Sequence, residues 1–577
     1  MIWFLDNTAR LNLERQEIDN LLAETDWLND VNWTFINGRI GLTATIDLNS
    51  RLFPIRLIYP NLFPATPPSI YPQDQDKRWS EHQYGAGGEL CLEWGPDNWY
   101  EEITGATMLR SAYKLLSSEV GSEDQEAQEE IPSRHSLTLG QELRTKPLRF
   151  VCDNSTSDYL SSLAPRVIAD INMWLTTHME SITAYFNAIT LPSGDTWINT
   201  VIPSPLKKIA FEKEGLYVST SMSEENIQAL SYERLLDLLE NWVSDEKNIE
   251  TRSIKTVLLS SESKKLHLFL ISDKHNLLKF QTVRVESSYP NSRIDPSLSC
   301  LAKKSAGIVG LGSAGSKMAL SLARSGLREF FLVDHDIFLP ENICRHELDW
   351  EHVARHKVNA IEHRLKLISE EINVSTRKLL LSGQEASAGI DNTLNKLGGC
   401  DVIVDATANP DVFNLLSTVA ARYKTPMIWL EIFAGGIGGF IGRYRPEIEP
   451  DPKTMRLHLL GYLDKQNKEF PKTNSDYAAV TRQEEPIIAT DSDVAIISAH
   501  ATQMALDILL ENKPSRFPYS MYLVGLKRGW VFDEPFYTIP LDMEDAQINT
   551  TEKEFSSSEE QEEAIGFLTE LVEKQSD

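Results

Sequence analysis

Three glycines in the second half of the chain have the spacing of a phosphate-binding turn. Gly310, Gly312 and Gly315 follow the apolar stretch Ala306–Val309 and precede a predicted helix over Ser316–Ser325. Glycine lets the backbone approach a phosphate closely, and the N-terminus of a helix offers unpaired N–H donors to anionic oxygens. The pattern therefore predicts that a nucleotide binds between this strand and this helix.

The next apolar stretch ends at a carboxylate. Asp334 follows the predicted strand Glu329–Val333, near the spacing at which an acidic residue holds the ribose hydroxyls of a nucleotide. A glycine turn of this kind also opens dinucleotide-binding dehydrogenases. The turn and Asp334 alone therefore leave two interpretations open, hydride transfer and ATP chemistry.

The residues that follow favour ATP. The runs VDHDIFLPENICRHELDWEHVARHKVNAIEHRL and CDVIVDATANPD resemble the ubiquitin-activating, ThiF and MoeB superfamily, and the resemblance extends over about residues 290–545. It implies that this region adenylates a carboxylate with ATP. The residues that match the family's characteristic Asp, Asn, Arg and Lys, and its strand-end Asp, are Asp334, Asn342, Arg345, Lys357 and Asp405.

The chemistry of adenylation explains these residue types. When a carboxylate attacks the α-phosphate, an anion approaches a triphosphate, and Arg345 and Lys357 would neutralise that charge. Asp405 would bind Mg²⁺, which prefers one or two carboxylates together with phosphate oxygens. A dehydrogenase needs no such cluster. The structural alternative for Arg345 and Lys357 is a surface ion pair, worth only ~0–1 kcal/mol.

The resemblance also bears on assembly. In this family an arginine upstream of the glycine turn reaches the nucleotide of the partner subunit, and Arg293, in NSRIDPSLSCLAKKSAG, matches that arginine by position. The resemblance therefore implies a homodimer with two composite sites.

A second constellation, in the first 120 residues, surrounds a cysteine. The segments YPNLFPATPPSI and GGELCLEW resemble ubiquitin-conjugating enzymes, whose pattern places a proline run and a histidine before a catalytic cysteine. Prolines lack an N–H and fix φ, so they suit an irregular crossing beyond the edge of a sheet. The matching residues are Tyr59, Pro60, Pro64, Pro67, Pro68, His82, Gly88 and Cys91.

Cys91 is the predicted nucleophile of this region. A thiolate accepts an acyl group as a thioester, which stays reactive towards an amine. The family's oxyanion-stabilising asparagine is absent, so Gln83 or Asn98 is the candidate amide donor, with His82 as further support. The structural alternative for Cys91 is a small buried hydrophobic residue.

One cysteine expected from the resemblance is missing. Activating enzymes of this type usually carry a second cysteine in a crossover loop, predicted here over Gly461–Ser492, but no cysteine follows Cys400. Three explanations stay open: direct transfer from AMP to Cys91, an oxyester on a loop hydroxyl, or a loop cysteine replaced at Ala478 or Ala479. The candidate hydroxyls are those of Thr481, Thr490 and Ser492.

Composition excludes several other classes of function. A net charge of −28 opposes general binding to nucleic acid. No stretch approaches the ~18 apolar residues of a membrane span, and no secretory signal is visible. The five cysteines form no C-x-x-C pair, which argues for a reducing cytoplasm and against a four-cysteine zinc site. Cys344 is expected to serve packing.

The patterns predict a multidomain protein of mixed α/β and α+β class. We expect an N-terminal ubiquitin-conjugating-like α+β domain, a linker, a middle α+β domain of unknown role, a Rossmann-like ThiF-type adenylation domain and an acidic C-terminal tail. Their predicted bounds are 1–120, 121–139, 140–295, 296–548 and 549–577.

The spacing of the apolar residues gives three local predictions of secondary structure. Thr34–Asp47 alternates like one strand, Asp158–Ile189 favours a long helix, and Leu266–Ile271 favours a strand. The middle region shows no catalytic constellation, so we expect its His and Trp residues to serve packing.

A conjugating module placed before an activating module resembles the bacterial fusion proteins of CBASS anti-phage operons. The resemblance implies a partner with a flexible tail ending in glycine, either a cGAS/DncV-like nucleotidyltransferase or a ubiquitin-like protein. Its carboxylate would be adenylated with ATP and Mg²⁺, moved to Cys91 and ligated to a target amine. The alternatives are a sulfur-carrier adenylyltransferase, a non-catalytic scaffold that recruits a partner, and a dehydrogenase.

Overall fold

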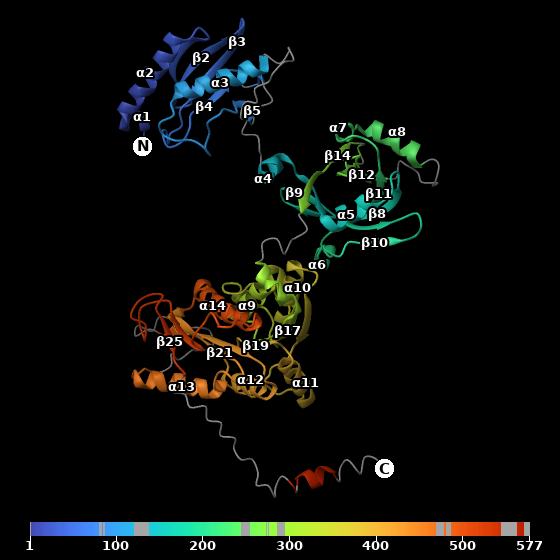
Figure 1. The fold of residues 1–577 in the computed structure, drawn as a ribbon, viewed down its shortest axis with the longest axis vertical. Helices are drawn as coiled ribbons and strands as arrows, with labels where there is room; N and C mark the ends of the chain where they lie inside the picture. The colour runs from blue at the N-terminus through green and yellow to red at the C-terminus, as the bar shows by residue number, and fades with distance from the viewer. Residues whose placement is uncertain are drawn as a thin grey trace. The chain divides into compact units, whose positions relative to one another are not determined.

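The computed structural model describes residues 2–74, 76–79, 83–84, 87–120, 138–243, 254–272, 274, 276–285, 295–468, 478–480, 486–543, 562 and 564–569. The chain divides into two units, Met1–Thr145 and Lys146–Asp577 (Figure 1). Nearly all of the predicted linker and most of the predicted acidic tail lie outside the described residues. No helix of the described part combines the length and the apolarity of a membrane span.

The first unit packs two long helices against a four-stranded antiparallel sheet in the order β1-β2-β3-β4. Asn37 and Gly38 both have positive φ and form the two-residue hairpin that separates β1 from β2. The prediction of one strand over Thr34–Asp47 is therefore wrong, because this turn divides it. The elements are α1 (Trp3–Asp6), α2 (Thr8–Glu24), β1 (Leu28–Ile36), β2 (Arg39–Leu48), β3 (Arg51–Ile58), β4 (Ser69–Pro72), β5 (Gln83–Tyr84), β6 (Glu89–Leu90), α3 (Gly105–Val120) and α4 (Leu139–Glu142).

A buried carboxylate ties this unit together. Glu14 of α2 accepts hydrogen bonds from the Tyr59 hydroxyl at 2.7 Å, the Gly105 N–H at 2.6 Å and Arg10 Nε at 3.0 Å. A Cβ at Gly105 would lie 2.1 Å from the Tyr59 hydroxyl, so only glycine fits at the start of α3. Glu14 thereby fixes the end of β3, from which the proline run departs, against both helices.

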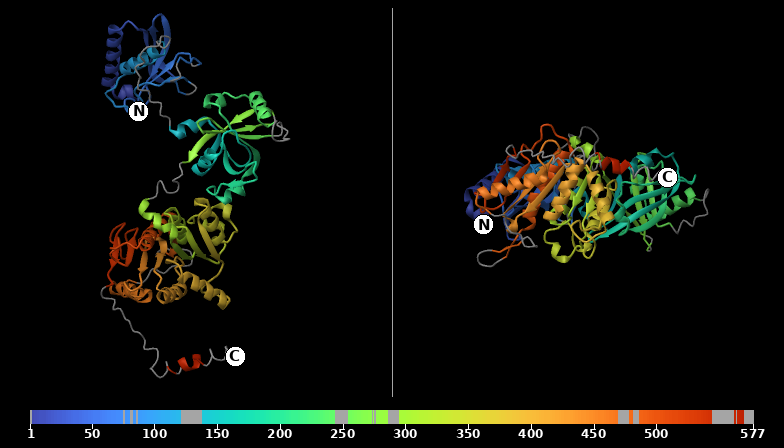
Figure 2. Two further views of the ribbon diagram at one scale, coloured as in Figure 1. Left: turned by 45° about the vertical axis from the view of Figure 1, so that its right-hand side comes forward. Right: turned by 90° about the horizontal axis from the view of Figure 1, so that it is seen from below.

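The middle part of the second unit is a curled sheet of nine strands among the described residues (Figure 2). Residues Leu277–Val285 close it: β14 pairs with β13, Phe280 N–H donates to Leu268 O, and β15 then pairs with β7. The elements are β7 (Leu148–Asp153), α5 (Asn154–Ser162), β8 (Ile168–His178), β9 (Ser181–Thr190), β10 (Thr196–Ile198), α6 (Ser204–Lys207), β11 (Phe211–Ser219), α7 (Glu224–Gln228), α8 (Tyr232–Val243), β12 (Thr256–Ser260), β13 (Leu266–Ile271), β14 (Leu277–Lys279) and β15 (Gln281–Val285).

The prediction of a long helix over Asp158–Ile189 is wrong. After the short helix α5, the chain forms the antiparallel hairpin of β8 and β9. Ala169, Ile171, Met173 and Leu175 alternate along β8 and are buried on one face of the sheet. That period of two overrides the helical spacing seen in the sequence.

The remainder of the second unit is an eight-stranded sheet in the order β18-β17-β16-β19-β20-β21-β24-β25. The first five strands are parallel and the last three antiparallel. The strands are β16 (Ser305–Val309), β17 (Glu329–Val333), β18 (Asn373–Arg377), β19 (Val402–Asp405), β20 (Met427–Ile432), β21 (Gly438–Tyr444), β24 (Met521–Gly525) and β25 (Thr538–Leu541).

Helices cover both faces of this sheet (Figures 1 and 2). One apolar cluster joins the sheet to α9, α10 and α14, and a second joins its other face to α11, α12 and α13. The chain leaves β16 first towards β17 and later towards β19, so a crevice forms where the strand order reverses, beyond the carboxyl ends of the strands. The helices are α9 (Ser313–Arg324), α10 (Lys357–Ile368), α11 (Ser387–Gly398), α12 (Pro410–Tyr423), α13 (Pro452–Lys465) and α14 (Asp491–Leu509).

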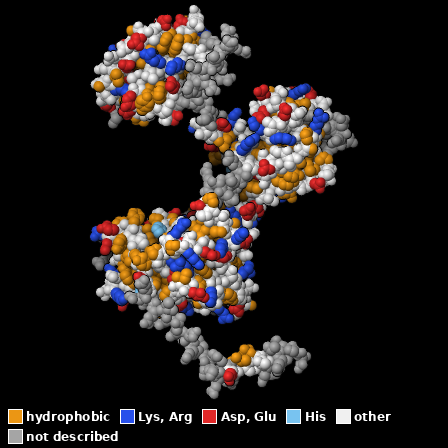
Figure 3. Space-filling model, in the orientation of Figure 1, with side chains coloured by type: hydrophobic (Ala, Val, Ile, Leu, Met, Phe, Trp, Pro, Cys, Tyr) orange, Lys and Arg blue, Asp and Glu red, His pale blue; other side chains and the backbone are white. Residues whose placement is uncertain are grey.

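Acidic and basic side chains are interspersed on the face of the molecule that Figure 3 shows. Exposed ion pairs also occur on the protein; in one of them Lys424 Nζ lies 2.7 Å from Glu447 Oε1. Such pairs contribute little to stability, since water and salt screen them.

Candidate nucleotide and acyl-transfer sites

The glycine turn lies at the carboxyl end of β16. Gly310 has φ of +83°, and a Cβ there would lie 2.9 Å from Thr407 Cγ2. A Cβ at Gly315 would lie 1.9 Å from Gly310 O, so the first turn of α9 packs directly on the glycine turn. Gly312, by contrast, precedes α9 and has no atom within 4 Å of its Cβ position. Open space therefore adjoins the N-terminus of α9 at Gly312, where a phosphate could approach.

Asp334 holds the turn from the neighbouring strand. Its carboxylate accepts hydrogen bonds from the Leu311 N–H at 2.6 Å and from the Asp336 N–H at 2.8 Å. These bonds use one oxygen each, so Asp334 anchors the backbone of the turn. Its predicted contact with ribose hydroxyls remains a prediction.

His346 is a residue of the site that sequence reasoning missed. Its Nε2–H donates to Leu311 O at 2.7 Å, and its Nδ1 accepts from the Leu348 N–H at 3.2 Å. Only the neutral ring with a proton on Nε2 satisfies both bonds. Burial lowers the pKa of His346 to about 4, although the bond to the Leu311 carbonyl opposes this shift. His346 therefore connects the glycine turn to the segment that carries the predicted Asn and Arg.

Asp405 stands at the end of β19, beside the glycine turn. It lies one residue before Ala406, whose N–H donates to Val309 O at the end of β16. Among the described residues only Thr407 hydrogen-bonds to Asp405, and both bonds, at 2.6 and 3.0 Å, go to Oδ1. Burial raises the pKa of Asp405 to about 6, against the bonds from Thr407. Oδ2 therefore remains available to a cation, and the carboxylate fits the predicted Mg²⁺ ligand.

Lys357 begins α10 and is buried, with 7% of its surface exposed. Its Nζ lies 2.5 Å from Asp336 Oδ2, two residues beyond Asp334. Burial would raise the pKa of Asp336, but the hydrogen bond and the positive charge of Lys357 hold that pKa below its usual value. A buried lysine at the start of a helix differs from the surface ion pair considered as the structural alternative.

Asn342 and Arg345 lie together on the connection between β17 and α10. The Asn342 side chain accepts from the Leu339 N–H at 3.0 Å, and Asn342 O accepts from the Arg345 N–H at 3.1 Å. Arg345 Nη1 donates at 3.5 Å to Ala489 O, just before α14. The fold thus brings this connection, the glycine turn and the residues before α14 to one edge of the sheet.

Two of the candidate relay hydroxyls are described. Thr490 caps α14, since its Oγ1 accepts from the Asp493 N–H at 3.3 Å, and it lies 2.8 Å from Ser492 Oγ. Both hydroxyls are therefore engaged at a helix N-terminus next to the carbonyl that Arg345 contacts. Thr481, Arg293 and His82 lie outside the described residues, and their roles remain predictions.

Cys91 follows strand β6 in the first unit and is partly buried. Its neighbours Leu90 and Leu92 are buried in the core, whereas Cys91 is not part of that core. Gln83 accepts from the Trp79 N–H at 2.6 Å and donates to Gly88 O at 2.8 Å. Gln83 thereby braces the hairpin that precedes the cysteine.

Asn98, the other candidate amide donor, closes the loop after Cys91. Its oxygen accepts from the Gly95 N–H and its Nδ2 donates to Glu93 O, both at 2.9 Å. The amide groups of Gln83 and Asn98 therefore both have structural hydrogen bonds. Their predicted role at an oxyanion stays a prediction.

Two further cysteines, Cys344 and Cys400, differ in burial. Cys344 is exposed, so the expectation that it serves packing is wrong; its Sγ donates to Glu341 O at 3.3 Å. Burial raises the pKa of Cys400 to about 11, so its thiol is protonated at neutral pH.

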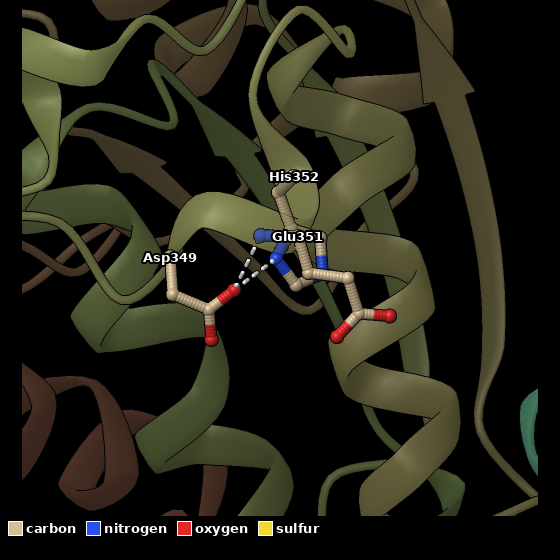
Figure 4. Close-up of side chains that lie close together, drawn as sticks. All are labelled: Asp349, Glu351 and His352. Carbon is tan, nitrogen blue, oxygen red and sulfur yellow. Dashed lines mark hydrogen bonds and ion pairs between the residues drawn. The ribbon is translucent and has the colours of Figure 1, made fainter.

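Asp349, Glu351 and His352 form a polar cluster before α10 (Figure 4). His352 is fully buried, its Nδ1 donates to Asp349 at 3.0 Å, and its Nε2 lies 3.3 Å from Nδ1 of His363. Both ring nitrogens of His352 are therefore occupied, and a metal would have to displace one of these bonds. The arrangement holds the chain in position before α10.

Comparison with known proteins finds a family that the region of the nucleotide site resembles. Residues 291–528 match the ThiF family. The match contains the glycine turn, Asp334, Asn342, Arg345, Lys357 and Asp405.

Two relatives extend this comparison. The uncharacterized protein y4qC of Sinorhizobium fredii is 22% identical over 428 residues, which cover 69% of this chain and 72% of y4qC. That match is longer than residues 291–577, so it extends into the chain before the ThiF match. The ATP-dependent ubiquitin transferase-like protein Cap2 of Pseudomonas aeruginosa is 26% identical over 166 residues, 28% of each chain.

Among solved structures, Escherichia coli MccB with ATP is 17% identical, with a TM-score of 0.32. The alignment covers 43% of this chain and 66% of MccB. The chain thus spans less than two thirds of MccB and less than a third of the Pseudomonas protein.

Proposed function

We propose that the domain over residues 296–548 binds ATP with Mg²⁺ and adenylates the C-terminal carboxylate of a partner protein. The proposal rests on three features that meet at one edge of the sheet. They are the open glycine turn at Gly312, the buried Lys357 and the buried carboxylate of Asp405, whose Oδ2 is available to a cation. The match of residues 291–528 to the ThiF family and the similarity to Cap2, an ATP-dependent ubiquitin transferase-like protein, support the same chemistry.

The charges of the site suit this reaction. The N–H groups at the start of α9 would receive phosphate oxygens, since Gly312 leaves the approach open. Lys357 and Arg345 would counter the charge of the triphosphate and the incoming carboxylate. Asp405 would hold Mg²⁺, which supplies positive charge to the phosphate oxygens when bound. A dehydrogenase would use the same turn but has no need of these three residues together.

We propose that the acyl group then moves to Cys91 as a thioester and from there to a target amine. Thiolate attack on the acyl adenylate forms the thioester bond and releases AMP, and amine attack forms an amide and returns the thiolate. The proline run and the hairpin braced by Gln83 support an exposed crossing around this cysteine. The proposed partner is a cGAS/DncV-like nucleotidyltransferase or a ubiquitin-like protein with a tail ending in glycine, and the proposed assembly is a homodimer.

Isothermal titration of the full chain with ATP and MgCl₂ tests the nucleotide half. We expect Asp405→Asn and Lys357→Met each to weaken ATP binding at least tenfold, whereas Asp391→Asn, an exposed acid on α11, leaves it unchanged. Equal ATP affinity in all four proteins would contradict the assignment of these residues.

Exchange of labelled pyrophosphate into ATP tests adenylation itself. Exchange should appear with a candidate partner that ends in glycine and vanish when that glycine is deleted. Exchange with every candidate regardless of its last residue would favour a small-molecule substrate, and exchange with none would favour the scaffold alternative.

Mass spectrometry tests the second half. A mixture with ATP and the partner should contain a covalent adduct on Cys91 that reducing agent removes. Conjugation by Cys91→Ala at the parent rate would exclude the thioester step while leaving adenylation intact. An adduct on Thr490 or Ser492 would instead indicate the relay.

A further inference from the structure

Glu431 is a buried acid without the partners that buried acids have elsewhere in this protein. It lies on β20 within the wholly buried stretch Met427–Ile432 and is 8% exposed. Its carboxylate has no hydrogen bond or ion pair with any described residue. The other buried acids of the described chain all accept hydrogen bonds; they are Glu14, Asp153, Asp405, Glu449, Asp493 and Asp507.

The lack of a partner has a physical implication. A largely buried carboxylate without a hydrogen bond is costly, because it loses most of its hydration and gains no hydrogen bond in return. All the residues of β20 except Glu431 are apolar, and an apolar residue at 431 would complete this buried strand. Packing therefore does not explain why an acid stands at position 431, whereas contact with a bound ligand would explain it.

The register of the sheet places Glu431 near the nucleotide site. Strands β19 and β20 are parallel, and Asp405 pairs with Trp429. Because side chains alternate along a strand, Glu431, two residues after Trp429, points to the same face as Trp429 and Asp405. Both acids therefore stand at the carboxyl edge of that face, beyond which the glycine turn lies.

The charges around the two acids do not balance. The negative charge of Asp405 raises the cost of ionising Glu431, and Arg456 of α13 is a cation that favours the ionised form of both acids. The Arg456 guanidinium stacks on the Phe413 ring, 5.1 Å from its centroid. Two carboxylates would repel a triphosphate at this edge unless a cation with more charge than one guanidinium stood between them.

We propose that Glu431 is the second carboxylate of the divalent-cation site built on Asp405. The inference rests on the proposed function, because the cation arrives with ATP. Mg²⁺ in nucleotide sites is held by one or two carboxylates together with phosphate oxygens, which matches this pair. Glu431 is then kept in a buried strand because the cation, rather than a protein group, compensates its charge.

Isothermal titration with ATP under two conditions separates the cation's role from that of the fold. In EDTA, Glu431→Gln should bind ATP as tightly as the parent or more tightly, because one repelling charge is gone. With saturating MnCl₂, the strengthening of ATP binding by the metal should be at least tenfold smaller in Glu431→Gln than in the parent. Glu534→Gln, which removes the same charge from an exposed position, should match the parent in both conditions.

The thermal midpoint of the metal-free protein provides a second readout. Glu431→Gln should unfold at the same temperature as the parent or higher, since it removes no hydrogen bond. An unchanged metal effect on ATP binding would overturn the proposal, and so would a lower midpoint with the metal effect intact. If the parent binds no ATP in either condition, the proposed function itself fails, and the two failures are thereby distinguished.

Discussion

His346 allows the link between the glycine turn and its supports to be measured. The bond that Nδ1 accepts from the Leu348 N–H requires the neutral ring, so protonation must break it. The pKa of His346 falls from 6.5 to about 4 in the folded protein. The folded state therefore binds fewer protons than the unfolded state between these values, and stability is lost as pH falls through this window. Above pH 6.5 the contribution is fully present.

The magnitude follows from the two pKa values. Each pKa unit corresponds to ~1.36 kcal/mol, so the full shift is worth about 3 kcal/mol, of which about 2 kcal/mol is lost between pH 8 and pH 5. In His346→Gln, the lost hydrogen bonds should cost about 1–3 kcal/mol at pH 8. At pH 5 the destabilisation of this variant relative to the parent should shrink by about 2 kcal/mol, because the glutamine does not titrate.

Urea unfolding at both pH values measures this difference in stability. Pulsed hydrogen exchange with mass spectrometry of peptides over residues 305–325 follows the unfolding at the glycine turn itself. His500→Gln is the matched control, because His500 is exposed on α14. A destabilisation by His346→Gln that is the same at pH 8 and pH 5 would refute the reasoning. So would a destabilisation that grows as the pH falls.

Three further predictions concern single contacts. Gly315→Ala should lower the melting temperature and abolish ATP binding, because its Cβ would lie 1.9 Å from Gly310 O, whereas Gly312→Ala should fold normally in the same melting assay. Glu14→Gln should destabilise the first unit by about 2–4 kcal/mol, because a charged acceptor of three hydrogen bonds is lost; hydrogen exchange of α2 and α3 peptides against urea measures this. Lys357→Met should leave the melting temperature within a few degrees of the parent's, because the Asp336 side chain is 50% exposed and water can solvate it. Calorimetry of this folded variant then measures the loss of ATP binding alone.

The sequence predicted much of the adenylation domain because buried parallel strands and amphipathic helices leave clear periods. The bounds predicted for Glu329–Val333 agree with β17, and those predicted for Ala306–Val309 agree with β16 to within one residue. Asp405 was predicted to serve the nucleotide site, and the pairing of β16 with β19 places it opposite Val309, the residue before the glycine turn. The roles assigned to these residues are still predictions.

Other features left weak or misleading signals. His346 binds two backbone groups, and backbone partners have no signature in the residue types around a histidine. Asp158–Ile189 contains apolar residues at both helical and strand spacing, and only the tertiary context of the curled sheet selects the strand. Glu431 could have been found, because a single acid in the apolar run MIWLEIF contradicts the usual composition of a buried strand.

The single stretch Leu277–Val285 that pairs with both β13 and β7 has a consequence for how the middle domain is made. Strand β7 begins at Leu148, so a ribosome must synthesise well over a hundred further residues before the ring of hydrogen bonds can shut. Until then two strands keep unpaired edges, which are templates for aggregation. Nascent chains that stop before Gln281 should therefore depend on chaperones, whereas longer ones should not.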